Sequence, residues 1–156
     1  MASWLNLIST VVIAATFFVL MGQLSAMRNA SRGQNLLSVV QWLSRDELRQ
    51  NRKFLIEWAG ENRRKPLDEK EREKVDTACS AYDVLAILIY DGTVPKEVFV
   101  GNWRNSISRC FEAVAPLLKQ YRVSGDPLYR DANYWKNFER LYNEVKKVRQ
   151  VGPPGD

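Results

Sequence analysis

The feature that most constrains this chain is an uncharged apolar stretch over residues 4–24. No Lys, Arg, Asp or Glu occurs before Arg28, and a helix over the 21 positions of the stretch would be about 31 Å long. That length matches the hydrocarbon core of a bilayer. We therefore predict a transmembrane anchor within residues 1–28. Its span contains Trp4, Leu5, Ile8, Val12, Ala15, Phe18, Leu20 and Leu24.

Such a stretch is either a cleaved secretory signal or a retained anchor. A signal peptide begins with Lys or Arg and ends at small residues in an A-x-A-like site. Here the start is uncharged and the best site, Leu24-Ser25-Ala26, carries a bulky Leu, so we predict a retained single-pass anchor. Arginines follow the stretch, which by the positive-inside rule places the N-terminus outside and the C-terminal domain in the cytoplasm. We expect the protein in the inner, cytoplasmic membrane.

The net charge of +5 is unevenly distributed. Residues 28–65 hold nine Lys and Arg against four Asp and Glu, residues 66–100 hold four against eight, and residues 101–156 hold ten against six. A basic neck beside a membrane favours contact with anionic lipid headgroups, and a solvated helical surface is the alternative. The candidate headgroup contacts are Arg28, Arg32, Arg45, Arg49, Arg52 and Lys53.

The composition argues against several kinds of active site. The chain has no histidine, which removes imidazole metal ligands and His-assisted nucleophiles. Its two cysteines, Cys79 and Cys110, lack CxxC spacing and fall at apolar helix positions. We interpret them as buried free thiols in a reducing compartment, with a disulfide as the alternative. We expect no metal site and no cofactor.

The polar part of the chain has helical spacing and no sustained strand alternation. A juxtamembrane amphipathic helix is predicted over 29–44, either continuing the span or hinged at Gly33. Ser44-Arg-Asp-Glu47 has the form of a capping box and predicts the start of the next helix. The predicted fold class is all-α: one N-terminal transmembrane helix followed by a small cytoplasmic helical bundle of four or five helices. The helical domain covers 45–147 and a flexible tail covers 148–156.

One helix is predicted to be central to the core. It opens at Pro66-Leu67-Asp68 and ends at Asp91-Gly92. Its apolar positions recur at spacings of three and four, and they are Val75, Ala78, Cys79, Tyr82, Leu85, Ala86 and Ile89. The run over 84–89 is apolar nearly all round and too short to cross a bilayer, so we predict that it is buried. In the next helix we allow for a break at Gly101-Asn102.

A set of packing and turn positions over residues 36–145 is similar to a known family. These positions are Tyr82, Leu85-Ala86, Asp91-Gly92, Val94, Val98-Phe99, Trp103, Phe111, Pro116, Tyr121-Arg122, Asp126-Pro127, Tyr129, Asn137-Phe138 and Leu141. In this order they resemble a bacterial family of membrane-anchored helical proteins that is catalogued as a domain of unknown function. The resemblance implies a short N-terminal anchor and a compact helical domain. It implies no activity.

Two groups of residues were considered as sites. Asp76, Asp83 and Asp91 could form a carboxylate set, but without a histidine or a second motif we interpret them as solvated or Arg-paired carboxylates. Aromatic and basic residues alternate near the C-terminus in a way that single-stranded nucleic acid could use. Their helical spacing favours instead one helix with an apolar core face and a basic outer face. The candidate core or interface aromatics are Trp42, Trp58, Trp103, Trp135, Tyr129 and Tyr134.

These patterns predict a non-enzymatic, single-span accessory or scaffold subunit that docks on a larger membrane complex or on copies of itself. The alternative is a membrane-tethered effector or sensor of the defence or stress type, whose span oligomerises or whose basic surface binds an anionic ligand. The expected partners are membrane lipid and a membrane protein complex or a homo-oligomer, and nucleic acid is not expected as a partner.

Overall fold

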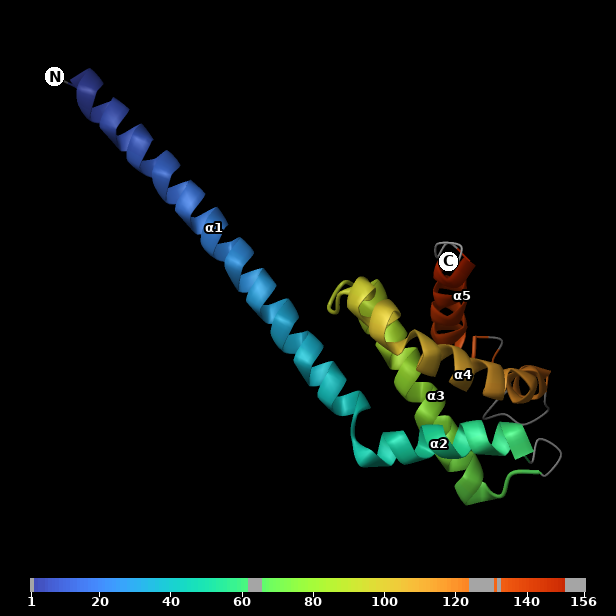
Figure 1. The fold of residues 1–156 in the computed structure, drawn as a ribbon. Helices are drawn as coiled ribbons and strands as arrows, with labels where there is room; N and C mark the ends of the chain where they lie inside the picture. The colour runs from blue at the N-terminus through green and yellow to red at the C-terminus, as the bar shows by residue number, and fades with distance from the viewer. Residues whose placement is uncertain (1, 62–65, 124–130, 132, 151–156) are drawn as a thin grey trace, which may run out of the picture.

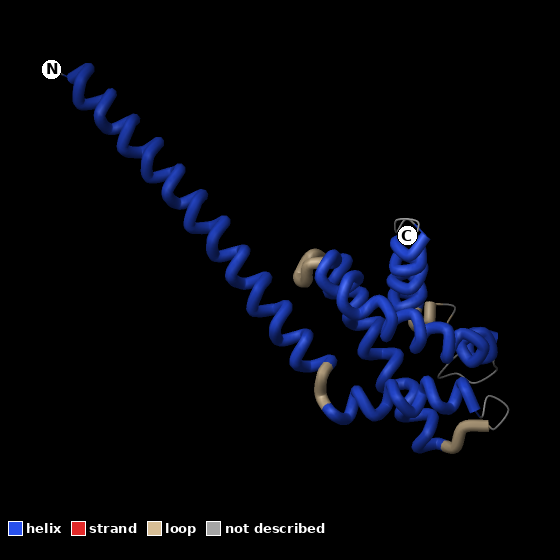
Figure 2. The backbone as a smooth tube through the Cα atoms, in the orientation of Figure 1, coloured by secondary structure: helices blue, strands red, loops and turns tan. Residues whose placement is uncertain are grey.

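The computed structural model describes residues 2–61, 66–123, 131 and 133–150, and it describes no side chains for residues 2–15, 61 and 148–150. Within these residues the chain is all-helical with five helices and no strand (Figure 2). The helices are α1 (Ala2–Leu43), α2 (Asp46–Glu61), α3 (Glu69–Tyr90), α4 (Lys96–Val123) and α5 (Lys136–Gln150). The prediction of an all-α fold is confirmed.

The longest helix, α1, extends away from the other four (Figure 1). It runs for 42 residues without interruption, so the helix predicted over 29–44 is continuous with the preceding residues. Gly33 lies inside α1, and a Cβ atom built there would meet nothing within 4 Å. Among the residues of α1 whose side chains are described, the buried ones are Val39 and Leu43, near its C-terminal end. Residues 44 and 45 then link α1 to α2.

The bundle is built around α3, which packs against α2, α4 and α5. Asp68 starts α3 with a capping box: its side chain accepts a hydrogen bond from the Glu71 backbone N–H at 2.8 Å, and the Glu71 carboxylate accepts one from the Asp68 N–H at 3.1 Å. Sequence spacing predicted such a box at Ser44–Glu47, whereas the box that the structure shows opens α3. Gly92 ends α3 at a φ of 79°, as the predicted Asp91-Gly92 stop requires.

All seven apolar residues predicted to face the core from α3 are buried. The neighbouring helices contribute large buried side chains to the same core, among them Leu55, Phe99, Ile107, Phe138 and Leu141. Helix α4 is continuous through Gly101 and Pro116, so the break allowed for at Gly101 does not occur.

The prediction that the whole run over 84–89 is buried is wrong. Val84 and Ile87 are 44% and 47% exposed, while Leu85, Ala86 and Ile89 are buried. The reason is that α2, α4 and α5 cover only part of the circumference of α3. One apolar face of this central helix is therefore open to its surroundings.

Candidate functional site

The most unusual surface of this chain is α1. Every residue from 16 to 34 is exposed, on all sides of the helix. The exposed large apolar residues in this stretch are Phe17, Phe18, Val19, Leu20, Met21, Leu24 and Met27, with Phe18 reaching 74%. A soluble protein rarely leaves so many consecutive apolar side chains uncovered.

In the part of the chain that the structure describes, no helix is both long enough and apolar enough to cross a membrane. Side chains are described only from Thr16 onward. Of the predicted span, Trp4, Leu5, Ile8, Val12 and Ala15 therefore lie outside the described side chains, and Phe18, Leu20 and Leu24 are exposed.

Five of the six predicted headgroup contacts are exposed. Arg28, Arg32 and Arg45 are exposed. Arg49 and Lys53 are also exposed, at 73% and 75% of their side chains, and form ion pairs with Asp46 at 3.1 Å and Glu57 at 3.6 Å. Such exposed pairs contribute little to stability.

Arg52 is the exception, because it is only 8% exposed. Its Nη1 donates a hydrogen bond to the carbonyl oxygen of Leu43, the last residue of α1, at 2.8 Å. Its guanidinium carbon lies 5.3 Å from the centre of the Trp103 ring on α4. The prediction that Arg52 contacts headgroups is thus corrected: this arginine joins α1, α2 and α4 inside the protein, satisfying an end carbonyl that α1 cannot satisfy itself.

The predicted aromatics lie mainly in or against the core. Trp42, Trp58 and Trp103 are half-buried and pack on it, as does Tyr134. Trp135 is 5% exposed, and its indole N–H donates to the Ser80 hydroxyl at 3.3 Å. Tyr129 lies outside the described residues.

Trp135 has a φ of 50°, a conformation that costs a bulky residue about 1–2 kcal/mol. The surrounding contacts hold it there. Its ring centre lies 4.5 Å from that of Tyr134 and 6.2 Å from that of Tyr121. These aromatics position the start of α5, whose residues Phe138, Leu141 and Val145 are buried. The apolar face predicted for this helix therefore points into the core.

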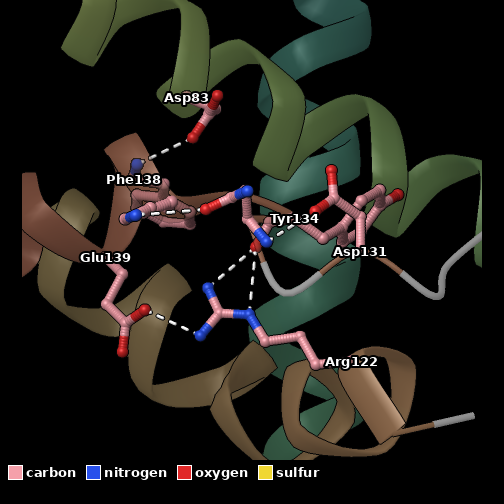
Figure 3. Close-up of polar contacts among 8 residues, drawn as sticks. Asp83, Arg122, Asp131, Tyr134, Phe138 and Glu139 are labelled. Atoms are coloured by element: carbon pink, nitrogen blue, oxygen red, sulfur yellow. Dashed lines mark hydrogen bonds and ion pairs between the residues drawn. The ribbon is translucent and has the colours of Figure 1, made fainter.

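A polar network attaches α5 to α3 and α4 (Figure 3). Asp83 of α3 accepts a hydrogen bond from the Phe138 backbone N–H at 2.8 Å and one from the Asn137 amide at 3.2 Å. A carboxylate at this point satisfies free N–H groups at the positive end of the α5 dipole. Arg122 of α4 donates to the Tyr134 carbonyl at 2.8 Å and to Glu139 at 2.8 Å.

Two of the three aspartates of the possible carboxylate set have separate structural roles. Asp83 caps α5, and Asp91 accepts the Thr93 backbone N–H at 2.8 Å. Hydrogen bonds from the Thr93 side chain and backbone hold the pKa of Asp91 below its usual value. Among the residues described, no group of three or more Cys, Asp or Glu could hold a metal ion.

Both cysteines are buried and free, as the apolar spacing predicted. Burial raises the pKa of Cys79 well above its usual value, with Cys110 and Asp76 adding to the effect. Burial likewise raises the pKa of Cys110 to about 11. Because the thiolate is the nucleophile, both groups are held in their unreactive form at neutral pH.

A groove lies where the corner between α1 and α2 meets the open face of α3. Its volume is about 1080 Å³, and its lining is Trp42, Arg45, Glu47, Leu48, Glu69, Arg72, Glu73, Asp76, Thr77, Ser80, Ala81 and Val84. No sequence pattern pointed to this groove, because it combines residues from three helices. The only signal was the apolar run over 84–89, which was predicted to be buried.

One comparison with known proteins gave a match. The model of a family described as "Domain of unknown function (DUF4760)" matches residues 9–145. This confirms the resemblance to a family of unknown function, and it carries no information on membrane anchoring or bacterial origin. No curated protein and no solved structure is significantly similar to the chain.

Proposed function

We propose that this chain, which belongs to the DUF4760 family, is a non-enzymatic, single-span membrane protein whose helical bundle docks on a larger membrane complex or on copies of itself. The observation that carries the proposal is the contrast between an uncharged apolar run over residues 4–24 and a polar bundle joined to it by one continuous helix. An apolar helix of that length is stable in a bilayer.

Two observations support a retained anchor. The family model begins at residue 9, inside the apolar run, so most of the run belongs to the matched unit. The exposed apolar residues of α1 between Phe17 and Leu24 lack cover from the bundle, and lipid would provide it.

The length of α1 determines what the bundle can reach. Nineteen residues separate Leu24 from Leu43, so at 1.5 Å per residue the end of α1 lies about 28 Å beyond the end of the proposed span. Arg28 and Arg32 lie about 6 Å and 12 Å past Leu24 along the same helix, which is within reach of headgroups. The exposed residues Arg45, Arg49 and Lys53 follow the end of α1. A protein partner therefore suits the bundle better than lipid does.

The structural roles of several polar groups in the bundle support a non-enzymatic function. Asp83 and Arg122 hold α5 in place, and Arg52 holds the end of α1. The two thiols are buried and protonated at neutral pH. Each of these groups has a structural role that accounts for it.

Flotation of cell membranes followed by gentle detergent extraction and native mass measurement tests the proposal. The chain should float with the membrane fraction and leave it in a complex larger than one copy. A lone monomer with no co-purifying protein would contradict the docking role, and a chain that stays with the soluble fraction would contradict the anchor.

A further inference from the structure

Charged and apolar residues lie at different ends of the groove at the corner of α1 and α2. Its floor is α3, and the lining residues of α3 run from Glu69 to Val84. Fifteen residue steps correspond to about 22 Å, or roughly four helical turns. One end of this floor carries Glu69 and Glu73, and the other carries Ala81 and Val84, with the exposed Ile87 one turn further on.

The charges in the groove are unbalanced. Four carboxylates line it against two arginines. Glu47, Glu69 and Glu73 form no ion pair with any described residue of the chain. The groove therefore combines a negative end with an apolar end, and Trp42 and Leu48 supply apolar surface on the opposite wall.

We infer that this groove binds a basic amphipathic helical segment of a protein partner in the same membrane. Lys or Arg side chains at one end of the segment would meet Glu69 and Glu73, and apolar side chains at the other end would cover Val84 and Ile87. A helix laid in a groove is a common recognition mode, and its length here matches about four turns. The inference deepens the proposed function and rests on it, since it names the surface through which the bundle docks.

The geometry disfavours lipid as the occupant. Trp42 lies eighteen residues past Leu24, or about 27 Å along α1 from the end of the proposed span. Anionic headgroups would also be repelled by the excess of carboxylates.

The basic neck of a second copy is equally disfavoured. Arg28 and Arg32 lie about 21 Å and 15 Å nearer to the membrane than Trp42 along the same helix. In a copy anchored in the same membrane they would lie nearer to the membrane than the wall of the groove at Trp42.

Site-specific photocrosslinking in the protein's own cells tests the inference. The photoreactive residue benzoylphenylalanine replaces Val84 at the apolar end of the groove or Glu73 at its charged end, in the full-length chain. A third variant carries it at Arg109, which is exposed on α4 and does not line the groove. Both groove positions should give adducts to one segment of one protein, and peptide mapping should find that segment amphipathic and positively charged. The Arg109 position should not give this adduct.

A charge reversal supplies the second measurement. Glu73→Lys, combined with the crosslinker at Val84, should lower the adduct yield about tenfold, the effect of losing about 1.4 kcal/mol of binding. Glu57→Lys makes the same change at an exposed site of α2 outside the groove and should leave the yield unchanged. Circular dichroism of each purified variant verifies that the bundle is folded.

The outcomes separate this inference from the proposed function. Adducts to lipid, to a second copy of the chain or to an acidic segment would overturn the inference, as would the absence of adducts in a chain that floats with the membrane. Flotation of the same cells reports on the anchor independently. A bundle that docks on a complex through another face would preserve the proposed function while this inference fails.

Discussion

Helix α1 and the four-helix bundle differ in how far their apolar side chains are exposed. The bundle buries its apolar side chains against one another: Leu55, Phe99 and Phe138 have no exposed surface at all. In α1, every residue from 16 to 34 is exposed, including Phe17 and Phe18. The bundle thus carries its own stabilising contacts, whereas α1 receives no cover from the bundle over residues 16–34. Stability measurements therefore report on the bundle, and partition measurements report on α1.

The largest expected effect is the loss of bundle stability in Phe138→Ala. The Phe138 ring is fully buried, stacks on Tyr82 with ring centres 5.0 Å apart and meets the edge of Phe111 at 5.2 Å. Its loss should reduce the free energy of unfolding by about 3–5 kcal/mol. Urea unfolding of the full-length protein in detergent measures this. The control is Phe18→Ala in α1, which should change the free energy of unfolding by less than about 0.5 kcal/mol. Equal effects would contradict the division between the two regions.

The next effect concerns α1 and leaves the bundle unchanged. Leu20→Arg puts a charge inside the proposed span, at a cost of about 2.5–3.5 kcal/mol for insertion near the centre of a membrane helix and less toward its ends. The membrane-bound fraction should fall in flotation, while the unfolding of the bundle stays the same. Leu37→Arg changes an equally exposed apolar residue of α1 beyond the proposed span and should preserve flotation. A loss of flotation in both variants would move the anchor boundary toward the bundle.

A smaller effect is expected where the two regions meet. Arg52→Met removes the hydrogen bond to the Leu43 carbonyl and the contact with the Trp103 ring. A buried hydrogen bond to a charged group contributes about 1.5–3 kcal/mol, and the free energy of unfolding should fall by that amount. Arg49→Met, three residues earlier, breaks only an exposed ion pair and should cost about 0–1 kcal/mol. If the two substitutions cost the same, Arg52 does not hold α1.

The last effect is a pH dependence of the bundle. In the unfolded chain a thiol ionises near pH 8.5, whereas burial raises the pKa of Cys110 to about 11 and also raises that of Cys79. Above pH 8.5 the folded state therefore holds more protons than the unfolded state, so stability falls with rising pH by up to about 1.4 kcal/mol per pH unit for each thiol. Urea unfolding between pH 8.5 and 10 measures the slope. The double variant Cys79→Ala, Cys110→Ala should lose most of this pH slope. An unchanged slope would show that other groups cause the pH dependence.

Helical periodicity predicted the elements of the bundle well, because local pattern determines them. The apolar positions of α3 and its end at Gly92 depend on spacing and on one residue type, and both were found as predicted. The same reasoning failed over 84–89. An all-round apolar run does not reveal which side a neighbouring helix will cover, and Val84 and Ile87 remained exposed.

The polar contacts could not be predicted, because they join residues far apart in the chain. Asp83 caps a helix that begins more than fifty residues later, and Arg122 reaches Tyr134 and Glu139, which lie twelve and seventeen residues further along the chain. Arg52 looked like the other basic residues near the neck, yet it is buried. Its role depends on the direction in which α1 arrives, which no local pattern encodes. The groove could not be predicted either, because its lining combines residues from three helices.

Because the link between α1 and α2 is short, a tilt of α1 would move the bundle with it. Only residues 44 and 45 separate the two helices, and Arg52 fastens the last carbonyl of α1 to the bundle. Membrane helices tilt by about 20° on average. If α1 is anchored as proposed, a tilt of that size swings its far end sideways by about 10 Å, given the rise per residue of a helix. Bilayer thickness, which influences the tilt of a membrane helix, would then affect where the bundle meets its partner.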